Sequence, residues 1–203
     1  MGVAQDGPRL AAVDGDEVYD QLIEIEESVP VAEKAERFEE LATILAAGEN
    51  GRASFLVAAG EHWQMRGRYD DARRCFEAAL ADGGSTGTSP LANLHALALE
   101  TGDEETAVEL LAQLRDLARR GELVPTDCLF IGESLESHDR LREALRWFTI
   151  PLSRLDPTFD QEDLDPYCLL GRLRVRRLLD LPADRYDQVA IALQAEFPAG
   201  TGA

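Results

Sequence analysis

The sequence RGRYDDARRCFEAAL, from Arg66 to Leu80, contains the pattern from which the fold of this chain can be predicted. Within it Ala72, Phe76 and Leu80 are spaced four residues apart, so on a helix they lie one above another. They form a stripe of one small and two large apolar side chains. A stripe of this kind must be covered by another element, and the flanking sequence indicates which one.

The composition is that of a globular protein with a large acidic excess. The chain has 203 residues, of which 45% are hydrophobic and 29% charged, and its formal net charge is −19. No apolar run approaches the roughly 18 residues of a membrane span. The amino terminus has neither a secretory signal nor a myristoylation motif, so we expect a cytoplasmic protein. The acidic excess disfavours nucleic acid and anionic membranes as partners and favours a basic partner.

Helical apolar spacing recurs along most of the chain, and no sustained alternation indicates strands. About ten helices are expected, with Asp103 and Asp184 capping two of them. Their expected spans are 15–28, 31–47, 52–66, 69–82, 89–101, 104–120, 126–138, 140–155, 162–181 and 184–197. The small and polar segments 1–14 and 198–203 are expected to be flexible termini.

The short breaks between these helices predict antiparallel neighbours, and the sequence repeats itself. The interval is 35 residues from Ala72 to Ala107 and 37 residues from Ala107 to Ala144. The other aligned positions are Gly67, Gly102 and Asp139, then Tyr69, Glu104 and Leu141, then Phe76, Leu111 and Phe148. The chain is therefore predicted to consist of repeated helix pairs.

The copy from Ala53 to Leu80 resembles the tetratricopeptide repeat family, whose unit is a pair of antiparallel helices of about 34 residues. The matching positions are Leu56, Gly60, Trp63, Gly67, Tyr69, Ala72, Phe76 and Ala79. Gly60 and Ala72 are small because the two helices approach closely there, and aromatic side chains fill the surrounding space. The resemblance implies an all-α, right-handed α-solenoid of stacked antiparallel helix pairs, in which each pair is covered by the next.

One repeat domain is expected over residues 15–197, with repeats at about 53–87, 88–124 and 125–158 and degenerate pairs at 15–48 and 162–197. The copies depart from the family pattern at two positions. His95 stands where the family prefers Gly or Ala, and Pro151 is expected to kink or end a helix. The first helix of the last pair is expected to be longer than usual.

No catalytic motif is found, so we expect no enzyme activity, no metal and no cofactor. The histidines, His62, His95 and His138, occur singly on different helices, without ligand spacing. The cysteines, Cys75, Cys128 and Cys168, are expected to be buried free thiols. The acidic loop 156–166 lacks the glycine and the ligand spacing of a calcium loop, and a solvated connector that caps the next helix is expected.

In the tetratricopeptide repeat family the first helices of successive repeats line a concave surface that binds a peptide or helix of another protein. The resemblance places on this surface Val57, Glu61, Gln64, Asn93, Glu100, Leu129, Phe130, Glu133 and Glu136. This lining is acidic with an apolar floor, so a basic or amphipathic segment of a partner is expected there. The leading hypothesis is a non-enzymatic adaptor or scaffold.

Other interpretations stay open at this point. The glutamates are also compatible with an ordinary solvated helix face, and the groove with self-association into a homodimer. A regulator that contacts nucleic acid through the helix Arg172–Arg177 is a further alternative. Four arginines spread over roughly 200° of that helix, so ion pairing to acidic neighbours within the protein is the expected role.

Overall fold

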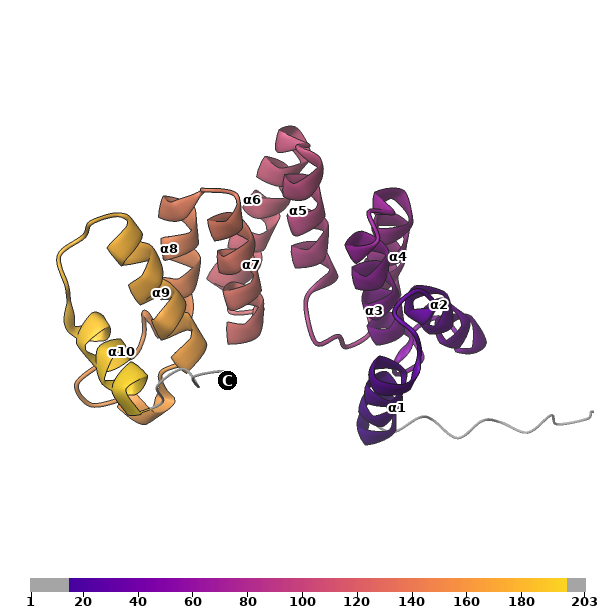
Figure 1. Ribbon diagram of the computed structural model, residues 1–203, viewed down its shortest axis with the longest axis horizontal. Coiled ribbons are helices and arrows are strands. Elements are labelled where there is room, and N and C mark those ends of the chain that lie inside the picture. The colour runs from indigo at the N-terminus through magenta and orange to yellow at the C-terminus, as the bar shows by residue number, and fades with distance from the viewer. Residues whose placement is uncertain (1–14, 197–203) are drawn as a thin grey trace, which may run out of the picture. The chain divides into compact units, whose positions relative to one another are not determined.

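A computed structural model describes residues 15–196 of the chain, and this part is all-α (Figure 1). It contains no strand, as the sequence predicts. The helices are α1 (Gly15–Ser28), α2 (Lys34–Ile44), α3 (Arg52–Met65), α4 (Tyr69–Asp82), α5 (Pro90–Thr101), α6 (Glu104–Arg120), α7 (Pro125–Ser137), α8 (Leu141–Thr149), α9 (Pro166–Leu178) and α10 (Arg185–Glu196), with 3-10 turns η1 (Ile150–Leu152) and η2 (Gln161–Asp163). Both expected flexible termini, 1–14 and 198–203, lie outside the described residues.

Most helix bounds match the expected spans, and two differences arise at prolines. α8 ends at Thr149 and passes into η1, which contains Pro151, so the expected end of the helix at this proline is confirmed. The expectation of a longer first helix in the last pair is wrong. α9 begins at Pro166, has 13 residues like α7, and is capped by Asp165, whose Oδ1 accepts a bond of 2.7 Å from the Cys168 amide.

The chain divides into two compact units between Pro90 and Leu91. The first unit contains α1 to α4, and the second contains α5 to α10. The division falls at the first residue of α5, three residues after the expected boundary between the repeats 53–87 and 88–124. None of the described helices has the length and apolar composition of a membrane span.

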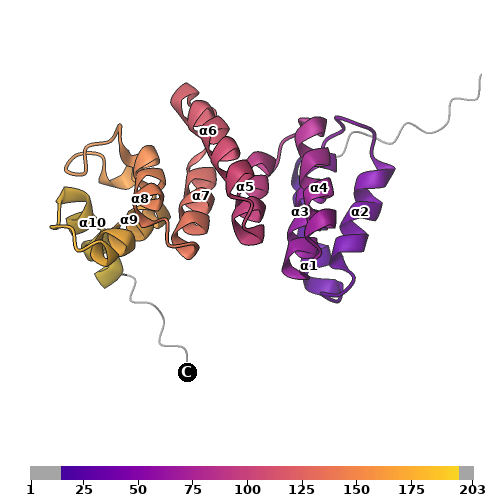
Figure 2. The ribbon, with the colours of Figure 1, turned by 90° about the horizontal axis from the view of Figure 1, so that it is seen from above.

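In the first unit α3 packs against both α2 and α4, and these three helices lie side by side in Figure 2. The predicted close approach of α3 and α4 is confirmed at Gly60. A Cβ atom added there would lie 2.7 Å from Cδ1 of Phe76, closer than van der Waals contact allows. Ala72 and Phe76 are both 0% exposed, so these two residues of the stripe found in the sequence face the core, whereas Leu80 is 47% exposed.

In the second unit the same arrangement joins α7 to α8. A Cβ atom on Gly132 would lie 2.6 Å from Cε1 of Phe148. α9 packs on this pair, and a Cβ atom on its Gly171 would lie 2.7 Å from the same ring carbon. Phe148 therefore fills the space that two glycines leave open on two neighbouring helices. Ala107 and Ala144 are also fully buried, as the repeat alignment requires.

The remaining caps follow the sequence prediction. The Asp103 side chain accepts from the Thr106 amide at the start of α6. At the start of α10, Asp184 and Asp187 accept from each other's amide, at 3.2 and 3.0 Å. These reciprocal bonds satisfy amides that have no partner inside the helix and set where the helix begins.

Candidate functional site

One side of α7 presents four of the predicted binding residues together. The helix buries Cys128, Ile131, Gly132 and Leu135 in the core. The other side of the helix presents, at helical spacing, Leu129, Phe130, Glu133 and Glu136. We call these four residues the α7 face. Leu129 and Phe130 are half-buried against the core, and Glu133 is exposed.

The two glutamates of the α7 face are in different electrostatic situations. Arg174 of α9 donates two hydrogen bonds of 2.7 Å to the carboxylate of Glu136, whose side chain is only 15% exposed. These bonds raise the pKa of Arg174 and neutralise Glu136 within the unit. Glu133 has no hydrogen bond or ion pair with any residue from 15 to 196. Its charge is therefore available to a partner.

In the first unit the predicted residue Glu61 lies in a cluster of charged groups. Glu26 of α1 is held by Lys34 Nζ and by His62 Nε2, each at 2.5 Å. Burial, together with the nearby charge of Glu26, raises the pKa of Glu61 to about 7. Near neutral pH Glu61 is thus only partly ionised, and this surface is less acidic than the sequence suggests.

Two of the predicted binding residues are buried and need correction. Val57 is 5% exposed and Asn93 is 1% exposed, so neither side chain is available to a partner in this structure. Each belongs to a helix segment that is buried on every side, 55–60 in α3 and 91–99 in α5. The sequence pattern predicted one outward face on these helices, whereas a helix that is apolar all round is covered all round.

The remaining predicted residues are divided between the two units. Gln64 is half-buried on α3 in the first unit, and Glu100 is exposed on α5 in the second. The structure therefore assembles the α7 face within one unit. A single concave surface that includes all nine residues stays a prediction.

The basic segment of α9 is largely neutralised by ion pairs, as expected. Arg172 contacts Asp184 at 2.6 Å and Asp187 at 2.9 Å, and Arg176 contacts Asp187 at 2.9 Å. Asp187 and Arg172 are buried, whereas Asp184 is partly exposed at the edge of this network. With Arg174 bound to Glu136, three of the four arginines are engaged within the unit.

Within the described part of the chain, the cysteines and histidines are not grouped as metal ligands. All three cysteines are free and buried, as predicted, and burial raises the pKa of Cys75 and Cys128 to about 12. At neutral pH these thiols are protonated and therefore poor nucleophiles. Over residues 15–196 no three or more His, Cys, Asp or Glu side chains are grouped as metal ligands.

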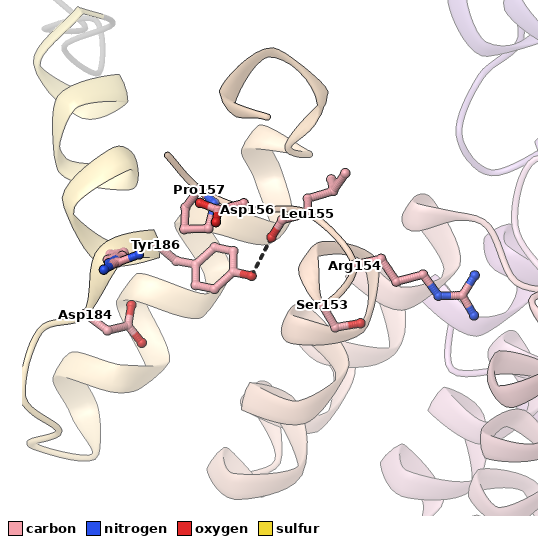
Figure 3. A pocket seen from close by; sticks show the side chains of 8 residues that line it. Ser153, Arg154, Leu155, Asp156, Pro157, Asp184 and Tyr186 are labelled. Atoms are coloured by element: carbon pink, nitrogen blue, oxygen red, sulfur yellow. Dashed lines mark hydrogen bonds between the residues drawn. The ribbon is translucent and has the colours of Figure 1, made fainter. Parts of the chain in front are cut away.

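A hollow of about 510 Å³ lies between the segment 153–157 and the start of α10 (Figure 3). Its central side chain, Tyr186, donates from its hydroxyl to the carbonyl oxygen of Leu155 at 2.8 Å. Asp184 caps α10 and binds Arg172, and Asp156 accepts from the Thr158 amide. The Tyr186 hydroxyl thus connects α10 to the segment that follows η1, whereas the bonds of Asp184 and Asp156 lie on either side of the hollow.

The structure defines an all-α protein whose helices pack in adjacent pairs, namely α3 with α4, α7 with α8 and α9 with α10. Comparison with protein-family models, with curated proteins and with solved structures gave no match.

Proposed function

We propose that this protein is a non-enzymatic interaction module of the tetratricopeptide repeat type, which binds a basic or amphipathic segment of another protein. The observation that carries the proposal is the α7 face, where the exposed and unpaired Glu133 stands beside the half-buried Leu129 and Phe130. The repeat assignment is supported by the glycine and phenylalanine contacts, which are 16 residues apart in both units, Gly60 with Phe76 and Gly132 with Phe148.

The chemistry of the α7 face suits a segment that combines Lys or Arg with large apolar side chains. Apolar contact with Leu129 and Phe130 would supply most of the affinity, because buried aromatic and aliphatic groups dominate binding energies. Glu133 would attract the basic residues and orient the segment. The net charge of −19 acts in the same direction, since it accelerates encounter with a basic partner.

The proposal includes a cytoplasmic location. This location is consistent with three cysteines that are all free thiols.

Two alternative functions stand beside the interaction module. Nucleic-acid contact through the helix Arg172–Arg177 has little support, because Arg172, Arg174 and Arg176 already bind carboxylates of the chain. Self-association is the remaining alternative, and light scattering at several protein concentrations tests it.

The proposal can be tested with a panel of synthetic peptides that pair Lys or Arg with Leu or Phe, measured by fluorescence anisotropy. We expect the wild type to bind such peptides and Glu133→Arg to weaken binding by about tenfold or more. Glu109→Arg makes the same charge change at an exposed position of α6 and should bind as the wild type does. Equal losses in the two variants, or no binding by the wild type, would contradict the proposal.

A further inference from the structure

The second unit carries a surface with free positive charges away from the α7 face. Two adjoining hollows, of about 250 and 480 Å³, lie where α6 ends, α7 begins and α8 passes into η1. Both are lined by Arg119 and Ile150. We call the two together the arginine pocket. None of the four residues of the α7 face lines it, so a ligand bound in this pocket would be independent of the proposed function.

Two rows of residues at helical spacing build the arginine pocket. Arg115 and Arg119 are four residues apart on α6, and Arg146 and Ile150 are four residues apart at the end of α8. Because α8 stops before Pro151 and continues as a 3-10 turn, the chain stays close and adds Arg154 to the rim.

The charges at the rim leave an uncompensated positive excess. Arg115 binds Glu143 at 2.7 Å, and Arg119 binds Asp116 at 2.6 Å. Arg146 and Arg154 are exposed and have no ion pair or hydrogen bond with the described part of the chain. Arg146 borders the smaller hollow and Arg154 the larger one, so each hollow has one free guanidinium group at its rim.

The smaller hollow of the arginine pocket has an apolar interior. The indole of Trp147 is 1% exposed and lines the smaller hollow, and Ile150 is half-buried between the two hollows. An apolar interior with guanidinium groups at the rim suits a ligand that has carboxylates next to a bulky hydrocarbon side chain. A guanidinium group can bind a carboxylate through two parallel hydrogen bonds, which gives direction as well as attraction.

We propose that the arginine pocket binds an acidic segment of a partner protein, whose apolar side chain lies against Ile150 and whose carboxylates pair with Arg146 and Arg154. Charge complementarity selects this occupant, because a basic segment would be repelled at the rim. The total volume holds several side chains and exceeds what one small anion fills. The protein then has two binding surfaces of opposite preference, the α7 face for basic segments and the arginine pocket for acidic ones.

The test uses the full chain and an unlabelled peptide of about twelve residues that contains Asp, Glu, Leu and Phe but no Trp or Tyr. One control peptide replaces Leu and Phe by Ala, and another replaces Asp and Glu by Lys. Binding is measured by calorimetry and by the fluorescence of Trp147. The chain has two tryptophans, so Trp63→Phe leaves Trp147 as the reporter. We expect the acidic apolar peptide to bind and to shift this emission, and both control peptides to bind at least about tenfold more weakly.

Two double variants with the same change in charge distinguish binding in the arginine pocket from attraction to the overall charge of the protein. Arg146→Glu with Arg154→Glu should weaken binding of the acidic apolar peptide by about tenfold or more. Arg142→Glu with Arg177→Glu makes the same change at two exposed arginines of the same unit outside the pocket, neither of which has an ion pair within residues 15–196, and should leave the affinity unchanged.

Several results would overturn this proposal. An equal loss of peptide affinity in the two double variants would show non-specific attraction. If the alanine peptide bound as tightly as the acidic apolar peptide, apolar contact would not contribute to binding. Displacement of the peptide by millimolar inorganic phosphate would indicate a site for small anions. A dimer that dissociates in Arg146→Glu with Arg154→Glu would identify a second copy of the chain as the occupant.

Discussion

Gly132 lies against the ring of Phe148 so closely that any side chain at position 132 would collide with it. Gly60 and Phe76 have the same relationship in the other unit, and the interval in the sequence is 16 residues in both. At the corresponding positions of the copy between them, the alignment places His95 and Leu111. In this copy the first residue, His95, is larger than glycine and the second, Leu111, is smaller than phenylalanine. Both side chains are buried.

Gly132→Ala should destabilise the protein by about 1 to 3 kcal/mol, because the new methyl group would lie 2.6 Å from a carbon atom of a buried ring. Gly87→Ala is the matched control, since an added Cβ there has no neighbour within 4 Å. Urea denaturation measures both. Similar stabilities for the two variants would mean that α7 and α8 separate at little cost.

Ala72→Leu should cost on the order of 1 to 3 kcal/mol, because Ala72 is fully buried where α4 meets α3. Ala81→Leu places the same side chain at an exposed position of the same helix and should have little effect. Thermal melts followed by circular dichroism compare the two. An unchanged melting temperature for Ala72→Leu would disprove the close packing at this position.

Glu61→Gln should stabilise the protein at pH 8 and have little effect at pH 4.5. In the folded protein the pKa of Glu61 is about 7, above its ordinary value of 4.5. Between these values the folded state holds a proton that the unfolded state releases, so stability falls as the pH rises through this range. Glutamine carries no titratable proton and so removes this effect. Urea titrations from pH 4.5 to 8 should therefore show the free energy of unfolding of Glu61→Gln rising increasingly above that of the wild type. A difference that stays constant with pH would contradict the prediction.

His95→Leu should reduce the loss of stability in acid. Neither ring nitrogen of His95 has a hydrogen-bond partner in the described structure, and burial, together with the nearby Arg140, lowers its pKa to about 4. As the pH falls from 6.5 towards 4, the unfolded chain takes up a proton that the folded chain does not, so stability is lost. Urea titrations from pH 7 to 4 measure this slope, with His138→Leu as the control for loss of an exposed imidazole. An equally steep slope in His95→Leu would show that another group causes the loss.

The helices and their pairing could be predicted because they depend on local spacing. Ala72, Phe76 and Leu80 lie on one side of a helix whatever surrounds them, although Leu80 itself is 47% exposed in the structure. Caps such as Asp103 and Asp184 act within a single turn, so they were also predictable. The start of α9 was missed although its signal, Asp165 followed by Pro166, is local as well.

The charges on the two proposed binding surfaces depend on contacts between residues that are far apart in the chain. The resemblance placed Glu136 in an acidic lining, but Arg174, 38 residues away, neutralises it. Glu61 was placed in the same acidic lining, whereas burial and Glu26 of another helix raise its pKa. The arginine pocket was not foreseen, because Arg115 and Arg146 become neighbours only when α6 packs near α8.

The order of helices, their pairing and the small residues at their contacts are thus contained in the amino-acid sequence, because spacing, caps and side-chain size act over a few residues. Which glutamates and arginines keep a free charge, and which apolar side chains reach the surface, depends on tertiary packing. Charge and exposure are set by all the neighbours of a group, and most of those neighbours come from other helices.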